Sequence, residues 1–179
     1  MRNKYSSIFW RYLILVLIAL PGFSIFYLVF LPLTIHPVSW VLGLFYPVSI
    51  LKNIVFVNSF PIEIIGACIA GSAYYLLLIL NLTIPDIPVL KRIKMIFLSF
   101  AAFFVINFIR IITLSIMYVE ESQAFELTHK LFWYLGSTLF VLAIWFLEVR
   151  LFRIRGVPIK DDLKYIYRRS SFRKTNRKN

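Results

Sequence analysis

The sequence predicts an all-α integral membrane protein with about four transmembrane helices, a re-entrant or interfacial segment, and both termini in the cytoplasm. Hydrophobic residues make up 60% of the 179 residues and aromatic residues 18%, and the mean hydropathy is +0.81. Soluble domains contain roughly 45–50% apolar residues, and a single core of this length could not hide such a surplus from water. We therefore expect a multi-pass protein of the cell membrane.

Four apolar runs are each long enough for a transmembrane helix, which takes about 20 residues. They cover residues 8–31, 62–82, 93–119 and 127–149. Pro21 and Gly22 predict a kink in the first run, which we interpret as an uncleaved anchor because it lacks a small-residue cleavage site. Residues 1–152 are therefore expected to form one transmembrane domain, and residues 153–179 a basic cytoplasmic tail.

The connection between the first two spans, residues 32–60, is apolar but is interrupted by Pro37 and Pro47. Hydropathy alone would allow a span over residues 33–51, but residues 54–57 are too few to cross back. We expect instead a re-entrant or interfacial helix near residues 38–46, followed by a short extended stretch over residues 53–57.

The distribution of Lys and Arg predicts the orientation. Basic residues precede the first span and lie between the second and third, and eleven follow residue 149, so all of these fall on one side of a four-span arrangement. The opposite side holds Lys52, Lys130, Glu120, Glu121 and Glu126. The positive-inside rule places the first side in the cytoplasm and the second toward the exterior or periplasm.

Three residues with chemical potential, Cys68, Arg110 and His129, fall in the outer half of separate spans. At about 1.5 Å per helical residue, Cys68 lies roughly 9 Å and Arg110 about 14 Å from the outer ends of their spans. His129 lies almost at the outer boundary. One outward-facing cleft could therefore hold all three.

Arg110 is the strongest individual signal, because a guanidinium keeps its charge and costs a few kcal/mol at mid-membrane. A functional role is the default for such a residue, and the alternative is a structural ion pair with Glu63. Asn107 lies three residues earlier, on the same helix face, and is expected to share the polar pocket.

Cys68 is the only cysteine, which excludes an internal disulfide and leaves either a small core residue or a reactive thiol. A nearby guanidinium would favour the thiolate, which is the attacking species. His129 could act as base toward the thiol and then as acid toward a leaving amine, although a lone interfacial histidine more often has no such role. The sequence contains no metal-ligand spacing and no phosphate-binding loop, so we expect neither a metal nor another cofactor.

Three segments resemble the exosortase and archaeosortase family. They are Ala67-Cys68-Ile69-Ala70-Gly71-Ser72, Asn107-Phe108-Ile109-Arg110-Ile111, and His129 followed by Gly136. Their order and their place in the topology agree with that family. The likeness covers residues 63–147, about half of the chain, and the compact length suggests a small archaeal-type member. The family commonly has Ser or Thr and then Gly directly after the cysteine, whereas here Ile69 and Ala70 precede Gly71.

The resemblance implies a membrane-embedded cysteine transpeptidase or protease whose active site faces the extracellular or periplasmic side. Cys68 would be the nucleophile, Arg110 would stabilise the oxyanion or thiolate, and His129 would be the general acid/base, with Asn107 in support. Its partners would be membrane-anchored proteins that carry a C-terminal sorting signal of a short motif, a transmembrane helix and a basic tail. A lipid is one candidate acceptor for the cleaved protein.

The alternative from another functional class is a YidC-like membrane insertase, which would use Arg110 in a polar groove and a ribosome-binding or lipid-binding tail. A scaffold held together by the small residues around Cys68 is a third reading. The basic tail is expected to contact anionic lipids and mainly to hold the topology, and we expect no nucleic-acid partner.

Overall fold

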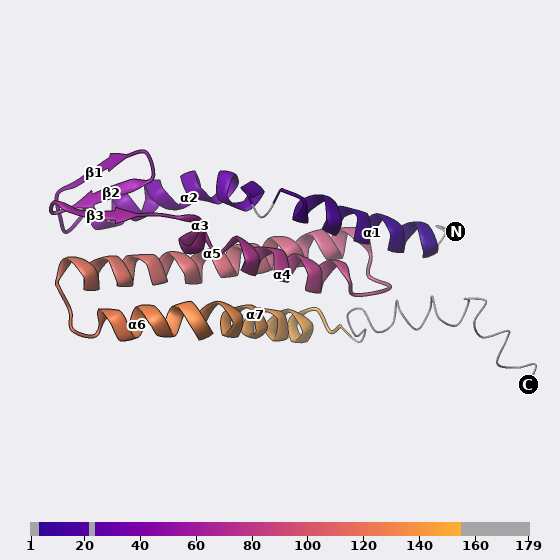
Figure 1. Cartoon of the computed structure of the whole chain (residues 1–179). Coiled ribbons are helices and arrows are strands. Elements are labelled where there is room, and N and C mark those ends of the chain that lie inside the picture. Colours follow the sequence, from indigo (N-terminus) through magenta and orange to yellow (C-terminus); the bar gives the residue numbers. More distant parts are fainter. Residues whose placement is uncertain (1–3, 22–23, 155–179) are drawn as a thin grey trace, which may run out of the picture.

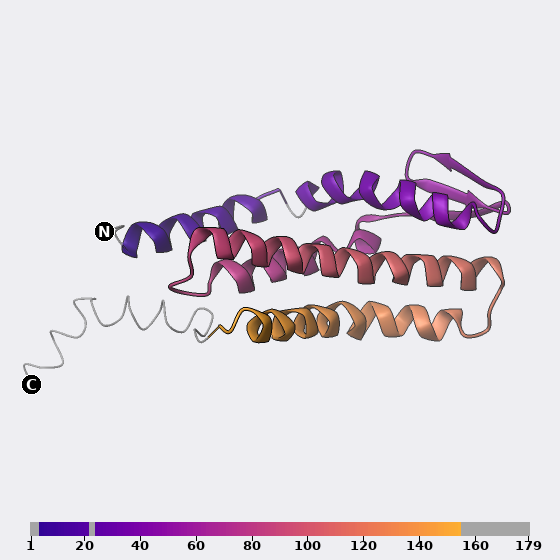
Figure 2. The same cartoon turned by 180° about the vertical axis from the view of Figure 1, so that it is seen from behind.

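The computed structural model describes residues 4–21 and 24–154, which form an elongated antiparallel bundle of helices with a small sheet at one end (Figure 1). The helices are α1 (Lys4–Ala19), α2 (Ser24–Leu42), α3 (Gly66–Ile69), α4 (Gly71–Leu82), α5 (Val89–Val119), α6 (Phe125–Leu131), the π-helical turn η1 (Phe132–Gly136) and α7 (Ser137–Leu151). The strands are β1 (Val48–Leu51), β2 (Ile54–Val57) and β3 (Phe60–Glu63). Helix α1 begins and α7 ends at the end of the bundle opposite the sheet (Figure 2).

Two of the described helices, α2 and α5, are long and apolar enough to cross a membrane. A third candidate is the pair α6–α7 with η1 between them, whose axis bends by 53°. The apolar stretches at residues 8–19 and 66–82 are shorter. Large apolar side chains are exposed along the whole bundle, for example Trp40, Phe97 and Phe146, as expected for surfaces that face lipid. The expectation of a mostly helical chain with membrane-length apolar helices is confirmed.

The first predicted span, residues 8–31, differs from the structure at its end. Helix α1 ends at Ala19 and α2 begins at Ser24, so the predicted span is divided between two helices. Pro21 of the predicted kink lies between them, and Gly22 lies outside the described residues. Helix α2 then continues through Pro32 and Pro37 to Leu42. The predicted re-entrant or interfacial helix near residues 38–46 is therefore wrong, because residues 38–42 form the last turns of α2. Prolines are tolerated in apolar membrane helices. Near Pro37, Ser39 Oγ donates a hydrogen bond of 2.7 Å to the Ile35 carbonyl one turn earlier.

The three-stranded antiparallel sheet is an addition to the predicted all-α architecture. The extended stretch expected at residues 53–57 is strand β2, and it pairs with β1 on one side and β3 on the other. Two-residue connections join the strands, and Lys52, Asn58 and Ser59 have positive φ angles there, as tight hairpin turns require. The sheet order β1-β2-β3 leaves β3 at an edge.

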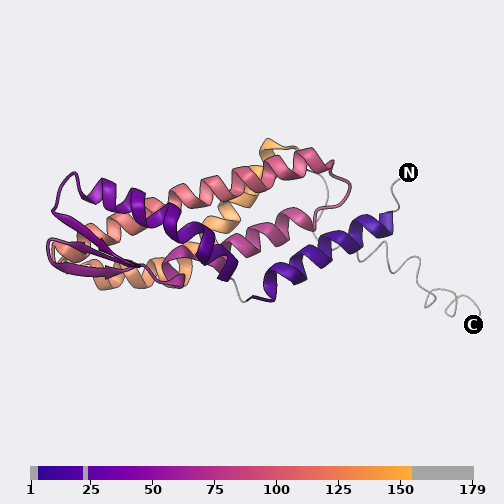
Figure 3. The same ribbon diagram turned by 90° about the horizontal axis from the view of Figure 1, so that it is seen from above.

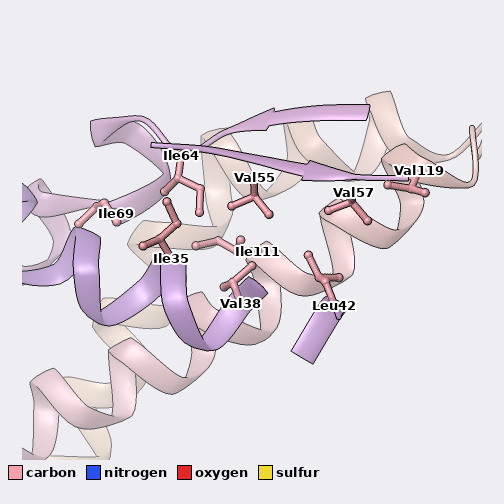
Figure 4. Packing of buried hydrophobic residues seen from close by; sticks show 9 residues of the cluster. All are labelled: Ile35, Val38, Leu42, Val55, Val57, Ile64, Ile69, Ile111 and Val119. Carbon is pink, nitrogen blue, oxygen red and sulfur yellow. The ribbon is translucent and has the colours of Figure 1, made fainter. Parts of the chain in front are cut away.

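Alternate residues of β2 turn into the core. Val55 and Val57 are fully buried between the sheet, α2 and α5, whereas Ile54 and Phe56 are only partly buried. Figure 4 shows the resulting cluster, in which the strand residues face Val38 and Leu42 of α2 and residues of α5. This packing holds β3 beside the C-terminal half of α5.

The opposite end of the bundle is held by arginines that cap α4. Arg92 donates to the carbonyls of Asn81, Leu82 and Ile84 at 2.6–2.8 Å, and Arg11 donates to two of the same carbonyls at 3.0 and 3.1 Å. These carbonyls are the unpaired acceptors at a helix C-terminus. Seen from above, α1 lies beside α4, and α2 lies over α5 (Figure 3). The two arginines that helped to predict orientation are thus also structural caps. Beyond Ile154, the basic tail lies outside the described residues.

Candidate functional site

Cys68, Arg110 and His129 line one cavity of about 270 Å³. They come from α3, α5 and α6, and the remaining wall is formed by β3 with the two residues after it and by the C-terminal half of α5. The cavity therefore brings together all three residues that the sequence singled out. Its wall also contains Pro61, Ile62, Glu63, Ile64, Ile65, Ile111, Leu114, Ser115, Tyr118, Phe125 and Trp133.

Cys68 lies in α3, a single helical turn that ends because Ala70 adopts the left-handed conformation with φ 55° and ψ 47°. An L-residue pays for that conformation with backbone strain, which the surrounding core must hold in place. The break leaves the Cys68 carbonyl without a helical partner, and the side-chain amide of Asn107 donates to it at 2.8 Å. The partly buried thiol lies 4.0 Å from the Glu63 carbonyl oxygen. The second predicted span is thus helical only from Gly66, since Ile62 and Glu63 belong to β3.

Arg110 is 7% exposed and its Nε donor has no hydrogen-bond partner. One terminal nitrogen lies 3.5 Å from the Asn107 side-chain oxygen, and the guanidinium carbon lies 6.0 Å from the centre of the Phe132 ring. A buried donor without a partner is costly, so this cation is poised for a ligand.

The ion pair between Arg110 and Glu63, the structural alternative for the arginine, is not present among the described residues. Glu63 instead accepts a hydrogen bond of 3.0 Å from the Asn53 side chain. The sequence alone leaves both a functional role for Arg110 and an ion pair with Glu63 open. Hydropathy places Glu63 on a helix, whereas it lies in strand β3.

His129 is held by aromatic rings. Its imidazole stacks on Phe125 at 5.4 Å between ring centres and meets Trp133 edge-on at 6.2 Å. Among the described residues no hydrogen bond joins this imidazole to the Cys68 thiol. Catalytic hydrogen bonds are often long or poorly aligned before substrate binds. What the structure shows is that His129 and Cys68 line the same cavity.

The turn η1 carries two further residues of the site. Its π-helical winding, a feature frequent at functional sites, places Trp133 in the cavity wall and Phe132 beneath Arg110. Gly136 ends the turn, and a Cβ there would come within 3.0 Å of the Phe132 ring. Gly136, one element of the family resemblance, therefore leaves room for the ring that contacts the arginine.

A second, larger cavity of about 660 Å³ adjoins the first and shares Arg110 and Trp133 with it. Five hydroxyl-bearing residues line it: Ser24, Tyr27, Ser72, Ser137 and Thr138. Small residues on either side of Cys68 complete the wall, including Gly66, Ala67 and Gly71. This cavity could not be predicted from the sequence, because its serines are far apart in the chain and are brought together only by the fold.

No protein-family model matches the chain, and no curated protein or solved structure matches it either. In the described part of the chain, no three His, Cys, Asp or Glu side chains form a group that could hold a metal ion.

Proposed function

We propose that this protein is a membrane-embedded cysteine transpeptidase or protease of the exosortase and archaeosortase type, a small archaeal-type member. The observation that carries the proposal is the convergence of Cys68, Arg110 and His129 on one cavity from three separate helices. A nucleophile, a fixed cation and an acid/base are the parts that acyl transfer requires. The positions of the three residues in their predicted spans led to the same expectation, that one outward-facing cleft could hold all three.

In this proposal the chain crosses the membrane four times. The crossings are α1 with α2, α3 with α4, α5, and α6 with η1 and α7. The cytoplasmic end carries Lys91, Arg92 and Lys94, and the outer end carries the acidic turn at Glu120 and Glu121. The cavity then opens toward the extracellular or periplasmic side. The positive-inside rule supports this orientation, with both termini in the cytoplasm.

The reaction begins when His129 accepts the thiol proton and the Cys68 sulfur attacks the substrate carbonyl carbon. The carbonyl electron pair moves to oxygen, and the Arg110 guanidinium stabilises the resulting oxyanion. A preorganised donor of this kind contributes about 3 kcal/mol in transition-state stabilisation. His129 then donates its proton to the amide nitrogen as the C–N bond breaks. The products of this half-reaction are a thioester on Cys68 and a free amine on the released transmembrane segment.

An acceptor resolves the thioester. An amine or hydroxyl group, on a lipid or another envelope molecule, or water attacks the thioester carbonyl, and the C–S bond breaks. The substrates in this proposal are membrane-anchored proteins with a C-terminal sorting signal made of a short motif, a transmembrane helix and a basic tail. Such a helix reaches the cavity laterally from the bilayer.

The direct test is co-expression with a protein of the same genome that ends in this three-part signal. C-terminal processing is followed by gel shift and mass for the wild type, Cys68→Ala and Cys68→Ser at matched membrane levels. The matched control is Ser115→Ala, which alters another residue of the cavity wall. We expect processing in the wild type and the control and none in either cysteine variant. Processing at an unchanged rate in Cys68→Ser would remove the nucleophile assignment.

A YidC-like insertase is the second candidate, and the larger cavity favours it. Arg110 with five hydroxyl-bearing residues forms a polar hollow between apolar helices, in which a polar segment could pass part of the membrane. That function would need Arg110 but not Cys68. Membrane insertion of a reporter that is lost in Arg110→Ala and retained in Cys68→Ala would favour the insertase.

A further inference from the structure

The outer wall of the cavity is a sheet edge. Strand β3 pairs only with β2 in the described sheet, so the backbone groups on its other side have no strand partner. A row of unpaired N–H and C=O groups is a template for another extended chain. Five consecutive residues, from Pro61 to Ile65, line the cavity directly before Cys68.

The register identifies which groups face the cavity. The Ile64 N–H bonds to the Asn53 carbonyl at 2.9 Å, so the pairs alternate and Ile62 also bonds toward β2, whereas Glu63, opposite Ile54, does not. The N–H and C=O of Glu63 therefore point to the free edge. The position of the Cys68 sulfur, 4.0 Å from the Glu63 carbonyl oxygen, agrees with this direction.

The extended backbone continues beyond β3 to Ile65, the residue before α3. Ile65 has φ −91° and ψ 171°, so the alternation places its N–H on the same edge as the groups of Glu63. Pro61 contributes a carbonyl there but no N–H. The edge thus offers an acceptor at Pro61, a donor and an acceptor at Glu63, and a donor at Ile65. This alternation is complementary to the backbone of an extended peptide.

We propose that the substrate's recognition segment binds as a fourth strand, parallel to β3, along the edge from Pro61 to Ile65. This inference rests on the proposed function and specifies how its substrate is held. The direction follows from the topology, since β3 runs from the outer tip toward Cys68 (Figure 1), and a sorting segment followed by a membrane helix runs the same way. The opposite wall of this cavity of about 270 Å³ includes Tyr118 and Phe125.

Parallel pairing defines three substrate positions. The residue whose N–H bonds to the Glu63 carbonyl lies beside the sulfur and contributes the reacting carbonyl. The residue before it turns its N–H away from β3. The residue two positions before donates its N–H to the Pro61 carbonyl and accepts from the Glu63 N–H. Recognition is therefore partly a backbone effect, which tolerates variation in the side chains of the substrate.

The test uses acetyl-trialanine chloromethyl ketone on the full-length protein in detergent, with chloroacetone as the non-peptide reagent. In either reaction the Cys68 sulfur displaces chloride, a C–S bond forms, and the thiol proton passes to the medium. The reaction is followed by intact mass, which is unambiguous because the chain has one cysteine. We expect the peptide reagent to react at least about 10-fold faster, since each backbone hydrogen bond contributes on the order of 1 kcal/mol.

N-methylated versions of the same reagent give the decisive comparison. Methylation of the first or third alanine should slow labelling by about 5-fold to 10-fold, and methylation of the second should change it by less than about 2-fold, because only that N–H points away. Equal slowing at all three positions, or equal rates for the peptide reagent and chloroacetone, would overturn the strand model while leaving a reactive Cys68. Failure of both reagents to label Cys68 would overturn the proposed function as well.

A variant pair tests the protein side. Glu63→Pro removes the edge N–H without touching the ladder to β2, and Glu63→Ala keeps that N–H while removing the side-chain bond to Asn53. The readout in each variant is the ratio of the labelling rate with the peptide reagent to that with chloroacetone. We expect this ratio to fall to about 1 in Glu63→Pro and to stay high in Glu63→Ala. A retained advantage in Glu63→Pro would contradict the assignment of Glu63.

Discussion

The side-chain amide of Asn107 donates a hydrogen bond of 2.8 Å to the backbone carbonyl of Cys68. Its oxygen faces Arg110 at 3.5 Å, so one amide spans the two residues proposed for nucleophilic attack and oxyanion stabilisation. This bond exists because the chain breaks its helix at Ala70 and exposes the Cys68 carbonyl. The position of the thiol thus depends on a neighbouring helix rather than on α3 alone.

Asn107→Ala should lower the free energy of unfolding by about 1–3 kcal/mol, because it leaves a buried carbonyl unsatisfied. Substrate processing should fall further than protein level as the thiol loses its fixed position. The measurement is processing rate normalised to membrane level. Asn53→Ala, which removes an exposed amide bond to Glu63, is the control and should process normally. Equal effects of the two variants would contradict a specific role for Asn107.

Arg110→Lys should retain insertion and lose roughly 100-fold in processing rate. Lysine keeps the charge, but a point charge replaces the planar fork that reaches Asn107 and the cavity, and loss of one oxyanion donor costs about 10²–10³ in rate. Single-turnover rates at saturating substrate separate this effect from binding. A variant with full activity would show that charge alone suffices.

Ala70 tests the strained break after α3. Ala70→Gly should be active and at least as stable, because glycine adopts a φ of 55° without strain. Ala70→Val should lose stability by more than about 1 kcal/mol and lose activity, since a branched side chain is poorly accommodated both there and in the surrounding core. Thermal unfolding in detergent measures both variants. If Ala70→Val were stable and active, the left-handed conformation at this position would not be required for the fold or for activity.

Tyr46 and Glu120 form a contact at the sheet end of the bundle that is expected to respond to pH. The Tyr46 hydroxyl donates to the Glu120 carboxylate at 3.0 Å, and this hydrogen bond raises the pKa of Tyr46, with smaller contributions from desolvation and from the carboxylate charge. A raised pKa means that the contact is fully present below the ordinary tyrosine value of about 10 and is lost as pH rises through the folded value.

The titration of Tyr46 can be followed by NMR of ring-labelled tyrosine, with the signal assigned by Tyr46→Phe. Glu120→Gln should lower the pKa of Tyr46 toward the ordinary tyrosine value. The Tyr46 ring signals should not change between pH 6 and about 9 in either protein, because the hydroxyl stays protonated there. An identical Tyr46 pKa in the wild type and Glu120→Gln would contradict the contact.

The sequence was informative where chemistry and hydropathy agree. The apolar run at residues 93–119 corresponds to α5 with the same C-terminal residue, and the grouping of Cys68, Arg110 and His129 follows from their order and charge context. The grouping is seen in the cavity, and its catalytic role stays a prediction. Charge also indicated the end of the bundle at which Arg11 and Arg92 lie.

Hydropathy did not predict the sheet, because an apolar stretch can form either a membrane helix or a buried strand. Residues 48–63 are apolar enough for lipid, yet alternate burial and the turn at Asn58 and Ser59 make them a sheet. The predicted second span therefore begins too early, and it puts Glu63, the partner in the alternative ion-pair reading of Arg110, on a helix rather than on β3. A search for two-residue turns flanked by β-branched residues would have found the hairpin.

The central claim is that Cys68 carries the substrate as a thioester, and hydroxylamine tests it most directly. Purified wild-type protein, Cys68→Ala and His129→Ala are incubated with a three-part substrate and hydroxylamine, and the new C-terminus is determined by mass. Hydroxylamine attacks the thioester carbonyl and releases Cys68, so the account predicts a substrate ending in a hydroxamate with the wild type, far less with His129→Ala, and none with Cys68→Ala. Cleavage that yields only a free carboxylate, or a hydroxamate formed by Cys68→Ala, would contradict it.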